Sequence, residues 1–154
     1  MGDVILKNGT IYTADEIADL SDDEKANVIA VVCIVGEKTY AMGLEQYKGT
    51  WDNIAAIASE YGSENNIPTE FSQNWTVPDK DLLNAIFANK DLINKSLQAI
   101  GEKIEVLAED EYWSSTENGD SAAFFQIFDE DGEQDDTTKT HEYSVFVIRE
   151  WKKS

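Results

Sequence analysis

Short apolar stretches, separated by turn residues, dominate the first third of the chain. Residues 4–12 contain two such stretches around an Asn-Gly pair, which favours the positive backbone φ of a tight hairpin turn. Residues 15–26 mix acids with alanine and leucine and predict a short helix. Residues 28–35 are apolar at every position, as expected of a strand buried on both faces at the centre of a sheet. A glycine turn then leads into residues 39–44, the expected antiparallel partner.

Apolar residues at helical spacing follow in the middle third. Residues 51–61 predict the first long helix, with Thr50 as its N-cap and Gly62 as the residue that ends it. Asp79 predicts the N-cap of a second helix, because its carboxylate can accept a hydrogen bond from a backbone N–H that lacks a helical partner. A third helix is expected over residues 90–100, ending at a glycine.

The last third changes to strand character. Residues 111–116, 122–128 and 143–151 are rich in aromatic and β-branched residues, and residues 128–132 predict a hairpin turn between two of these strands. This order predicts an α+β fold with a mixed or antiparallel sheet and two to three flanking helices. We expect a single domain over residues 1–154, with the two ends of the chain paired in one sheet.

The charge of the chain excludes some partners. The 154 residues include 12 Lys and Arg and 31 Asp and Glu, which gives a formal net charge of −19 at pH 7. Such a charge repels nucleic acids and anionic lipid surfaces. We therefore expect no nucleic-acid partner and a basic or neutral ligand. No stretch reaches the ~20 apolar residues of a membrane-spanning helix, so no membrane insertion is expected.

The single cysteine and single histidine limit the chemistry. Cys33 lies inside the apolar run 28–35 and is expected to be buried, and an intrachain disulfide would need a second cysteine. His141 is the one histidine, so a Cys/His zinc site is excluded by count. The chain does not begin like a signal peptide. A cytosolic protein, a particle-carried protein and a chain whose leader was removed all stay open.

Four stretches, in order, match the motifs of a known family. These are Leu6–Thr10, Trp75–Leu82, the strand Tyr-Trp-Ser-Ser-Thr-Glu at Tyr112–Glu117, and Val145–Trp151. Together they resemble the cysteine-poor C-type-lectin-like family, common in gut bacteria and their phages. This family shares its fold with formylglycine-generating enzymes and with the variable receptor-binding proteins of diversity-generating retroelements. The chain departs from the family pattern at Thr76, where the family often has arginine.

The resemblance implies a C-type-lectin-like fold and a non-enzymatic module that displays a variable binding face. It implies an extracellular, cell-surface or virion-associated setting, with a host or bacterial surface protein, or a glycan, as the partner. Phe124 and Phe125 are adjacent in a strand and point to opposite faces, so one is expected in the core and the other on the surface. Carried over to this chain, the binding face consists of Asn118, Asp120, Ser121, Phe124, Gln126, Gln134, Thr138, Lys139 and His141.

Other functions remain as alternatives. The formylglycine-generating relatives use a copper site made of cysteines, which one cysteine cannot supply, and His141 lies in no nucleophile motif. We therefore predict no enzyme, no cofactor and no metal site. Residues 129–136 resemble a calcium loop only loosely, and whether they bind Ca²⁺ stays open. The competing class is a structural module of a bacterial surface or virion assembly without a ligand site of its own.

Overall fold

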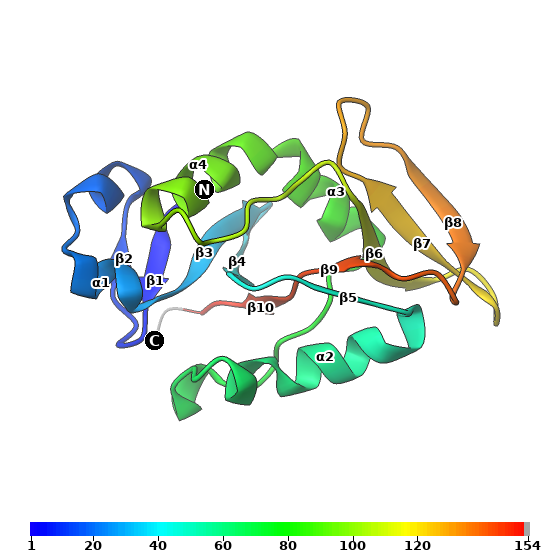
Figure 1. Cartoon of the computed structure of the whole chain (residues 1–154), viewed down its shortest axis with the longest axis horizontal. Coiled ribbons are helices and arrows are strands. Elements are labelled where there is room, and N and C mark those ends of the chain that lie inside the picture. Colours follow the sequence, from blue (N-terminus) through cyan, green and yellow to red (C-terminus); the bar gives the residue numbers. More distant parts are fainter. Residues whose placement is uncertain (153–154) are drawn as a thin grey trace.

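A computed structural model describes residues 1–152, which form two five-stranded sheets with helices on both sides (Figure 1). The first sheet has the strand order β10-β4-β3-β1-β2, and the second has the order β5-β9-β6-β7-β8. The strands β1 to β10 are Val4–Leu6, Ile11–Tyr12, Val28–Val35, Lys38–Gly43, Tyr47–Gly49, Glu111–Glu117, Ala122–Ile127, Gln134–Thr138, Tyr143–Val145 and Ile148–Glu150. The helices are η1 (Ala14–Asp19), α1 (Asp22–Ala26), α2 (Trp51–Glu64), η2 (Thr69–Phe71), α3 (Lys80–Ala88) and α4 (Lys90–Ile100). This confirms the α+β class.

Strand β3 lies at the centre of the first sheet, as its apolar sequence predicts. Val31 and Cys33 belong to a core cluster shared with α3 and α4, and Val32 belongs to a second cluster shared with α2. Figure 1 shows α4 on one side of β3 and α2 on the other side of the sheets. The predicted hairpins are confirmed, since β1 pairs antiparallel with β2, and β3 with β4.

The two ends of the chain share a sheet without pairing. Strands β1 and β10 both belong to the first sheet, but β3 and β4 lie between them. The expectation that the ends pair with each other is therefore wrong. The reason is that the hairpin of β3 and β4 fills the centre of the sheet, so the C-terminal strand can add only at the free edge of β4.

The final apolar run is two strands instead of one. Residues 143–145 form β9, which pairs with β5 and β6 in the second sheet, and residues 148–150 form β10 in the first sheet. Between them, Phe146 and Val147 are buried in the two different core clusters. The chain thus crosses from one sheet to the other here. The hairpin turn at 128–132 is confirmed, but its second strand is β8, which lies outside the three predicted strands.

The predicted caps and ends of the helices are confirmed in part. The carboxylate of Asp79 accepts a hydrogen bond of 2.8 Å from the backbone N–H of Leu82 at the start of α3, and Gly101 follows the end of α4. Thr50 occupies the N-cap of α2, but its hydroxyl accepts a hydrogen bond of 3.0 Å from the Asn53 side chain instead of one from a backbone N–H of the helix. Gly62 does not end α2, which continues to Glu64. The predicted helix at 15–26 is two short ones, η1 and α1.

Two tryptophans anchor the core on the side of α2. Trp75 and Trp113 are both buried and belong to the same cluster. The indole N–H of Trp75 donates to the Phe71 carbonyl over 2.8 Å, and that of Trp113 donates to the Gly49 carbonyl over 3.0 Å. Each side chain thus satisfies its one polar group while it buries a large apolar surface.

The burial of Cys33 leads to a testable expectation. Desolvation raises the pKa of its thiol from 9.0 to about 12, because the buried site disfavours the thiolate. We expect no reaction of the folded chain with a disulfide reagent at about pH 8, since the thiolate is the reactive form. One thiol per chain should react in concentrated guanidinium chloride. A folded chain that reacts as fast as the unfolded chain would contradict this burial.

Candidate functional site

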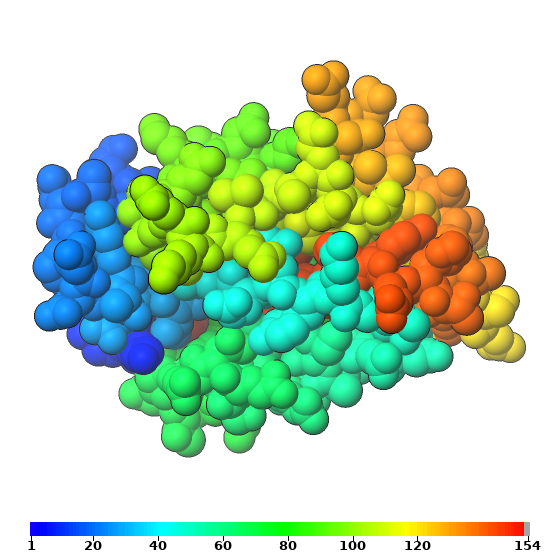
Figure 2. All heavy atoms as spheres, in the orientation of Figure 1, coloured from blue at the N-terminus to red at the C-terminus, as the bar shows by residue number. Residues whose placement is uncertain are grey.

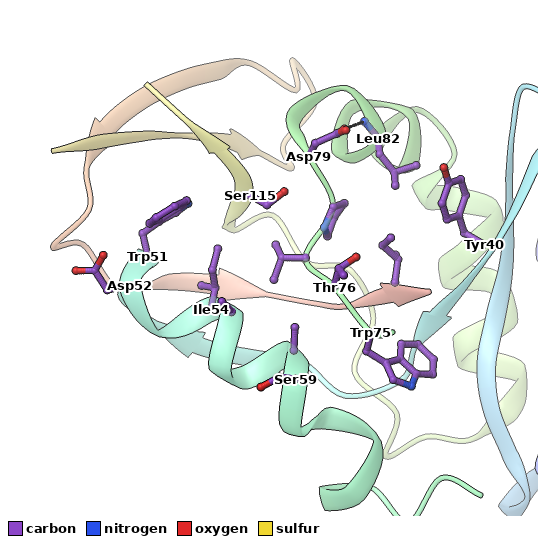
Figure 3. A pocket seen from close by; sticks show the side chains of 15 residues that line it. Tyr40, Trp51, Asp52, Ile54, Ser59, Trp75, Thr76, Asp79, Leu82 and Ser115 are labelled. Carbon is purple, nitrogen blue, oxygen red and sulfur yellow. Dashed lines mark hydrogen bonds between the residues drawn. The ribbon is translucent and has the colours of Figure 1, made fainter. Parts of the chain in front are cut away.

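A groove of about 670 Å³ lies between α2 and the segment that leads into α3 (Figure 3). The segment Trp75–Asp79 forms one wall and Ile54 and Ala55 of α2 the other. Trp51 and Asp52 lie at one end of the groove, and Tyr40 and Trp75 lie at the other (Figure 3). Its volume falls within the ~300–1,000 Å³ of typical ligand pockets.

Backbone hydrogen bonds hold the wall in place. Thr76 and Ile148 exchange two bonds, of 2.8 Å from the Thr76 N–H and 2.7 Å from the Ile148 N–H, so this wall runs alongside β10. Further on, the N–H of Ser115 in β6 donates to the Pro78 carbonyl over 2.9 Å. Proline fixes its own φ and keeps Val77 extended, which suits this path. The motif residues of three different stretches therefore meet at one site.

The groove is mostly apolar, and the charged residues that line it are all acidic. Its ionisable carboxylates are Asp52 and Asp79, and none of the described residues that line it is Lys or Arg. The hydroxyls of Tyr40 and Ser115 also lie along it. Carboxylates in a chain of net charge −19 disfavour an anionic ligand. The groove therefore suits a neutral or cationic ligand with apolar parts.

Trp51 is held rigidly at one end of this groove. Its indole N–H donates to the Ser114 carbonyl over 2.9 Å, and the Lys139 ammonium lies 4.4 Å from the centre of its ring. The same ammonium donates to the Glu117 carboxylate over 2.9 Å and to the Asp120 carbonyl over 3.0 Å. Lys139 is thus committed to contacts within the chain, and it joins the end of the groove to the loop between β6 and β7.

Two residues of the predicted binding face are largely covered. Gln126 is fully buried, and its amide donates to the Asn84 side chain and to the Gly132 carbonyl, each over 2.9 Å. The expectation that Gln126 is exposed for binding is therefore wrong, because α3 packs on this face of β7. Phe124 is half-buried beneath the Lys80 ammonium, which lies 4.5 Å from its ring centre. Phe125 lies in the core, so the opposite orientation of the two phenylalanines is confirmed.

A third, Lys139, has a side chain that is only 12% exposed, and the other predicted face residues lie at the surface. Lys139 and His141 contact Trp51 and Tyr143 respectively, and the His141 ring stacks on Tyr143 at 5.5 Å between centres. The remaining residues of the set are the exposed Asn118, Asp120, Ser121, Gln134 and Thr138. They come from the loop between β6 and β7 and from strand β8. Lys139 joins this loop, since its N–H donates to the Ser121 carbonyl and its ammonium to the Asp120 carbonyl, each over 3.0 Å.

The acidic hairpin tip is organised by hydrogen bonds within the chain. One carboxylate oxygen of Asp129 accepts bonds of 3.0 Å from the backbone N–H groups of Asp131 and Gly132. The Lys90 ammonium donates to the carbonyls of Phe128 and Asp129 over 3.2 and 3.3 Å. Over residues 1–152, no three side chains of His, Cys, Asp or Glu are grouped so that they could hold a metal ion. Among the helices of residues 1–152, none has the length and apolar character that a membrane span requires.

Comparison with known proteins identifies a shared fold. No protein-family model matches the chain, and no curated protein matches its sequence. Among solved structures, the chain is similar to a fimbrial protein from Bacteroides ovatus, with a TM-score of 0.68 and 15% sequence identity. The match covers 97% of this chain and 48% of the fimbrial protein, so the chain spans about half the length of that protein. At this identity the likeness shows the fold alone.

Proposed function

We propose that the chain is a non-enzymatic ligand-binding module on a C-type-lectin-like scaffold, carried on a cell or virion surface. The observation that carries this proposal is the apolar groove between α2 and residues 75–79. Its lining comes from three of the four stretches that resemble the family, together with α2. The surface setting is supported by the similar fold of a fimbrial protein, half of whose length the chain spans.

The ligand is a segment of a host or bacterial surface protein that has apolar side chains and no net negative charge. Apolar lining supplies burial, and the carboxylates of Asp52 and Asp79 disfavour acidic segments. The rigid Trp51 ring offers a large contact area at one end of the groove, and aromatic rings of this kind often dominate binding energy. The alternative is a glycan ligand, and the experiment below distinguishes it from a protein segment.

A substitution that fills the groove tests the proposal. Ala55 lines the groove on α2, and its neighbour Ala56 is exposed on the same helix without lining it. Wild-type chain is first applied to arrays of cell-surface proteins and of glycans. We expect Ala55→Trp to weaken binding to the best protein ligand at least ~10-fold, or about 1.4 kcal/mol. Ala56→Trp is expected to bind like the wild type.

The outcomes separate the candidate functions. Equal binding by Ala55→Trp and Ala56→Trp would exclude the groove as the site. A wild-type chain that binds only glycans would exclude the protein ligand. If the wild-type chain binds nothing on either array, the chain is a structural module of a surface assembly, the alternative that the fimbrial neighbour also favours. Circular dichroism and thermal unfolding of both variants verify that they fold.

A further inference from the structure

Strand β8 leaves one side of its backbone open. It is the outer strand of the second sheet, and its hairpin lies at the rim of the molecule (Figures 1 and 2). The bonds from Ile127 N–H to the Glu133 carbonyl, 2.9 Å, and from Lys139 N–H to the Ser121 carbonyl, 3.0 Å, fix which pairs of β7 and β8 are hydrogen-bonded. Because bonded pairs alternate along an antiparallel ladder, the N–H and C=O groups of the intervening residues point outward.

The outward residues of β8 are Gln134, Asp136 and Thr138. Within residues 1–152, the N–H and C=O of Gln134 and the C=O of Asp136 make no backbone hydrogen bond at this edge. The Asp136 N–H is bonded locally, to the Asp135 carboxylate over 2.8 Å, and the Thr138 carbonyl accepts a 3.4 Å bond from the His141 N–H. The edge therefore offers the N–H and C=O of Gln134 and the C=O of Asp136 to a further strand.

Charge decides what kind of strand can add. Asp136 shares its sheet face with Phe124, and Asp135 shares the opposite face with Phe125, so carboxylates stand on both faces of β8. Twelve Asp and Glu and no Lys or Arg lie between Ile104 and Thr138. A second copy of the chain, with the same acidic edge and a net charge of −19, would be repelled. A cationic segment would instead meet an opposite charge on either face.

We propose that an extended lysine- or arginine-containing segment of a partner protein adds to β8 as a sixth strand of the second sheet. Backbone hydrogen bonds to Gln134 and Asp136 supply the affinity, and the carboxylates of Asp135 and Asp136 select for positive charge, as in other cases of strand addition. This site is separate from the groove between α2 and residues 75–79. It uses Gln134 of the predicted binding face through its backbone.

A peptide of alternating lysine and valine, acetylated at its N-terminus, is the probe. We expect it to bind the full chain and to slow amide hydrogen exchange at Gln134. The same peptide with glutamate in place of lysine should not bind. A version N-methylated at alternate residues, which blocks one backbone edge while it keeps the charge, should bind at least ~10-fold more weakly. This last comparison uses the wild-type chain alone.

Two variants in β8 separate backbone pairing from charge. Gln134→Pro removes an outward N–H that makes no backbone hydrogen bond within residues 1–152 and leaves the β7–β8 bonds intact, and proline is found at edge strands in this way. Asp136→Asn removes the charge and keeps the N–H. We expect the proline variant to lose binding at least ~10-fold and the asparagine variant to lose about 3-fold or less, in a salt-dependent manner.

Several results would overturn the proposal. One is equal binding of the plain and N-methylated peptides, which would make the attraction electrostatic only. Another is an unchanged exchange rate at Gln134 when the peptide is bound. A third is weaker peptide binding by Ala55→Trp, which would place the peptide in the groove. Because Ala55→Trp should leave peptide binding at β8 unchanged, the failure of either proposal is distinguishable from failure of the other.

Discussion

Gly62→Ala is expected to lower the free energy of unfolding by about 2–3 kcal/mol, the cost of overpacking a close contact. A glycine-to-alanine change inside an exposed helix normally raises stability, by up to about 1 kcal/mol. The sign is reversed here because a Cβ at Gly62 would lie 2.0 Å from the Ser72 carbonyl oxygen. Ser72 cannot retreat freely, since the neighbouring Phe71 carbonyl accepts the Trp75 indole N–H.

Urea unfolding of matched variants measures this effect. Ser63→Ala, at the next and exposed position of α2, is the control and should change stability by no more than about 0.5 kcal/mol. The m-value is expected to stay constant in both variants, so that the midpoint alone shifts. A Gly62→Ala chain as stable as the wild type would show that the segment after η2 does not pack on α2 as described.

The sequence predicts best those elements that are determined by residues close to one another along the chain. The Asn-Gly turn, the cap at Asp79 and the glycine after α4 each depend on residues a few positions apart. Gly62 shows the limit of this reasoning. In sequence it resembles a helix end, but its role is to let Ser72, ten residues later, approach the helix. That contact is tertiary and leaves no local pattern.

The strands that the sequence missed or merged have equally physical reasons. Strand β8 consists of Gln, Asp and Thr and has neither apolar alternation nor a buried face, so no pattern marks it as a strand. Strands β9 and β10 are continuous in sequence because the crossing residues Phe146 and Val147 are also buried. The hydrophobicity of a residue indicates that it is buried, but it does not indicate which sheet the residue joins.

The candidate site was predicted least well. The predicted face was carried over from a resemblance, and the packing of α3 on Phe124 and Gln126 could not be foreseen without the fold. The sequence did single out Trp75–Asp79 and Ser115, but as framework residues. The structure places both along the groove. Ala55 is one of the apolar positions at helical spacing that predict α2, but that pattern does not show what lies opposite it.

Trp113→Ala is expected to lower the free energy of unfolding by about 3–5 kcal/mol, as for other buried tryptophans replaced by alanine. Trp113 is 1% exposed and packs against Tyr143 at 4.9 Å and Phe125 at 6.5 Å between ring centres. Its removal also leaves the Gly49 carbonyl without its donor. For a chain of this size we expect the thermal midpoint to fall by roughly 10 °C.

Two further tryptophan variants separate packing from hydrogen bonding. Trp113→Phe keeps an aromatic ring but leaves the Gly49 carbonyl unpaired, and should cost about 1–3 kcal/mol. Trp51→Phe loses a comparable bond, to the Ser114 carbonyl, at a half-buried position and should cost less than Trp113→Phe, since water can replace the lost donor. If Trp113→Ala were no more destabilising than Trp51→Phe, the central packing role of Trp113 would be excluded. Binding at the groove would then have to be explained without a rigid framework beneath it.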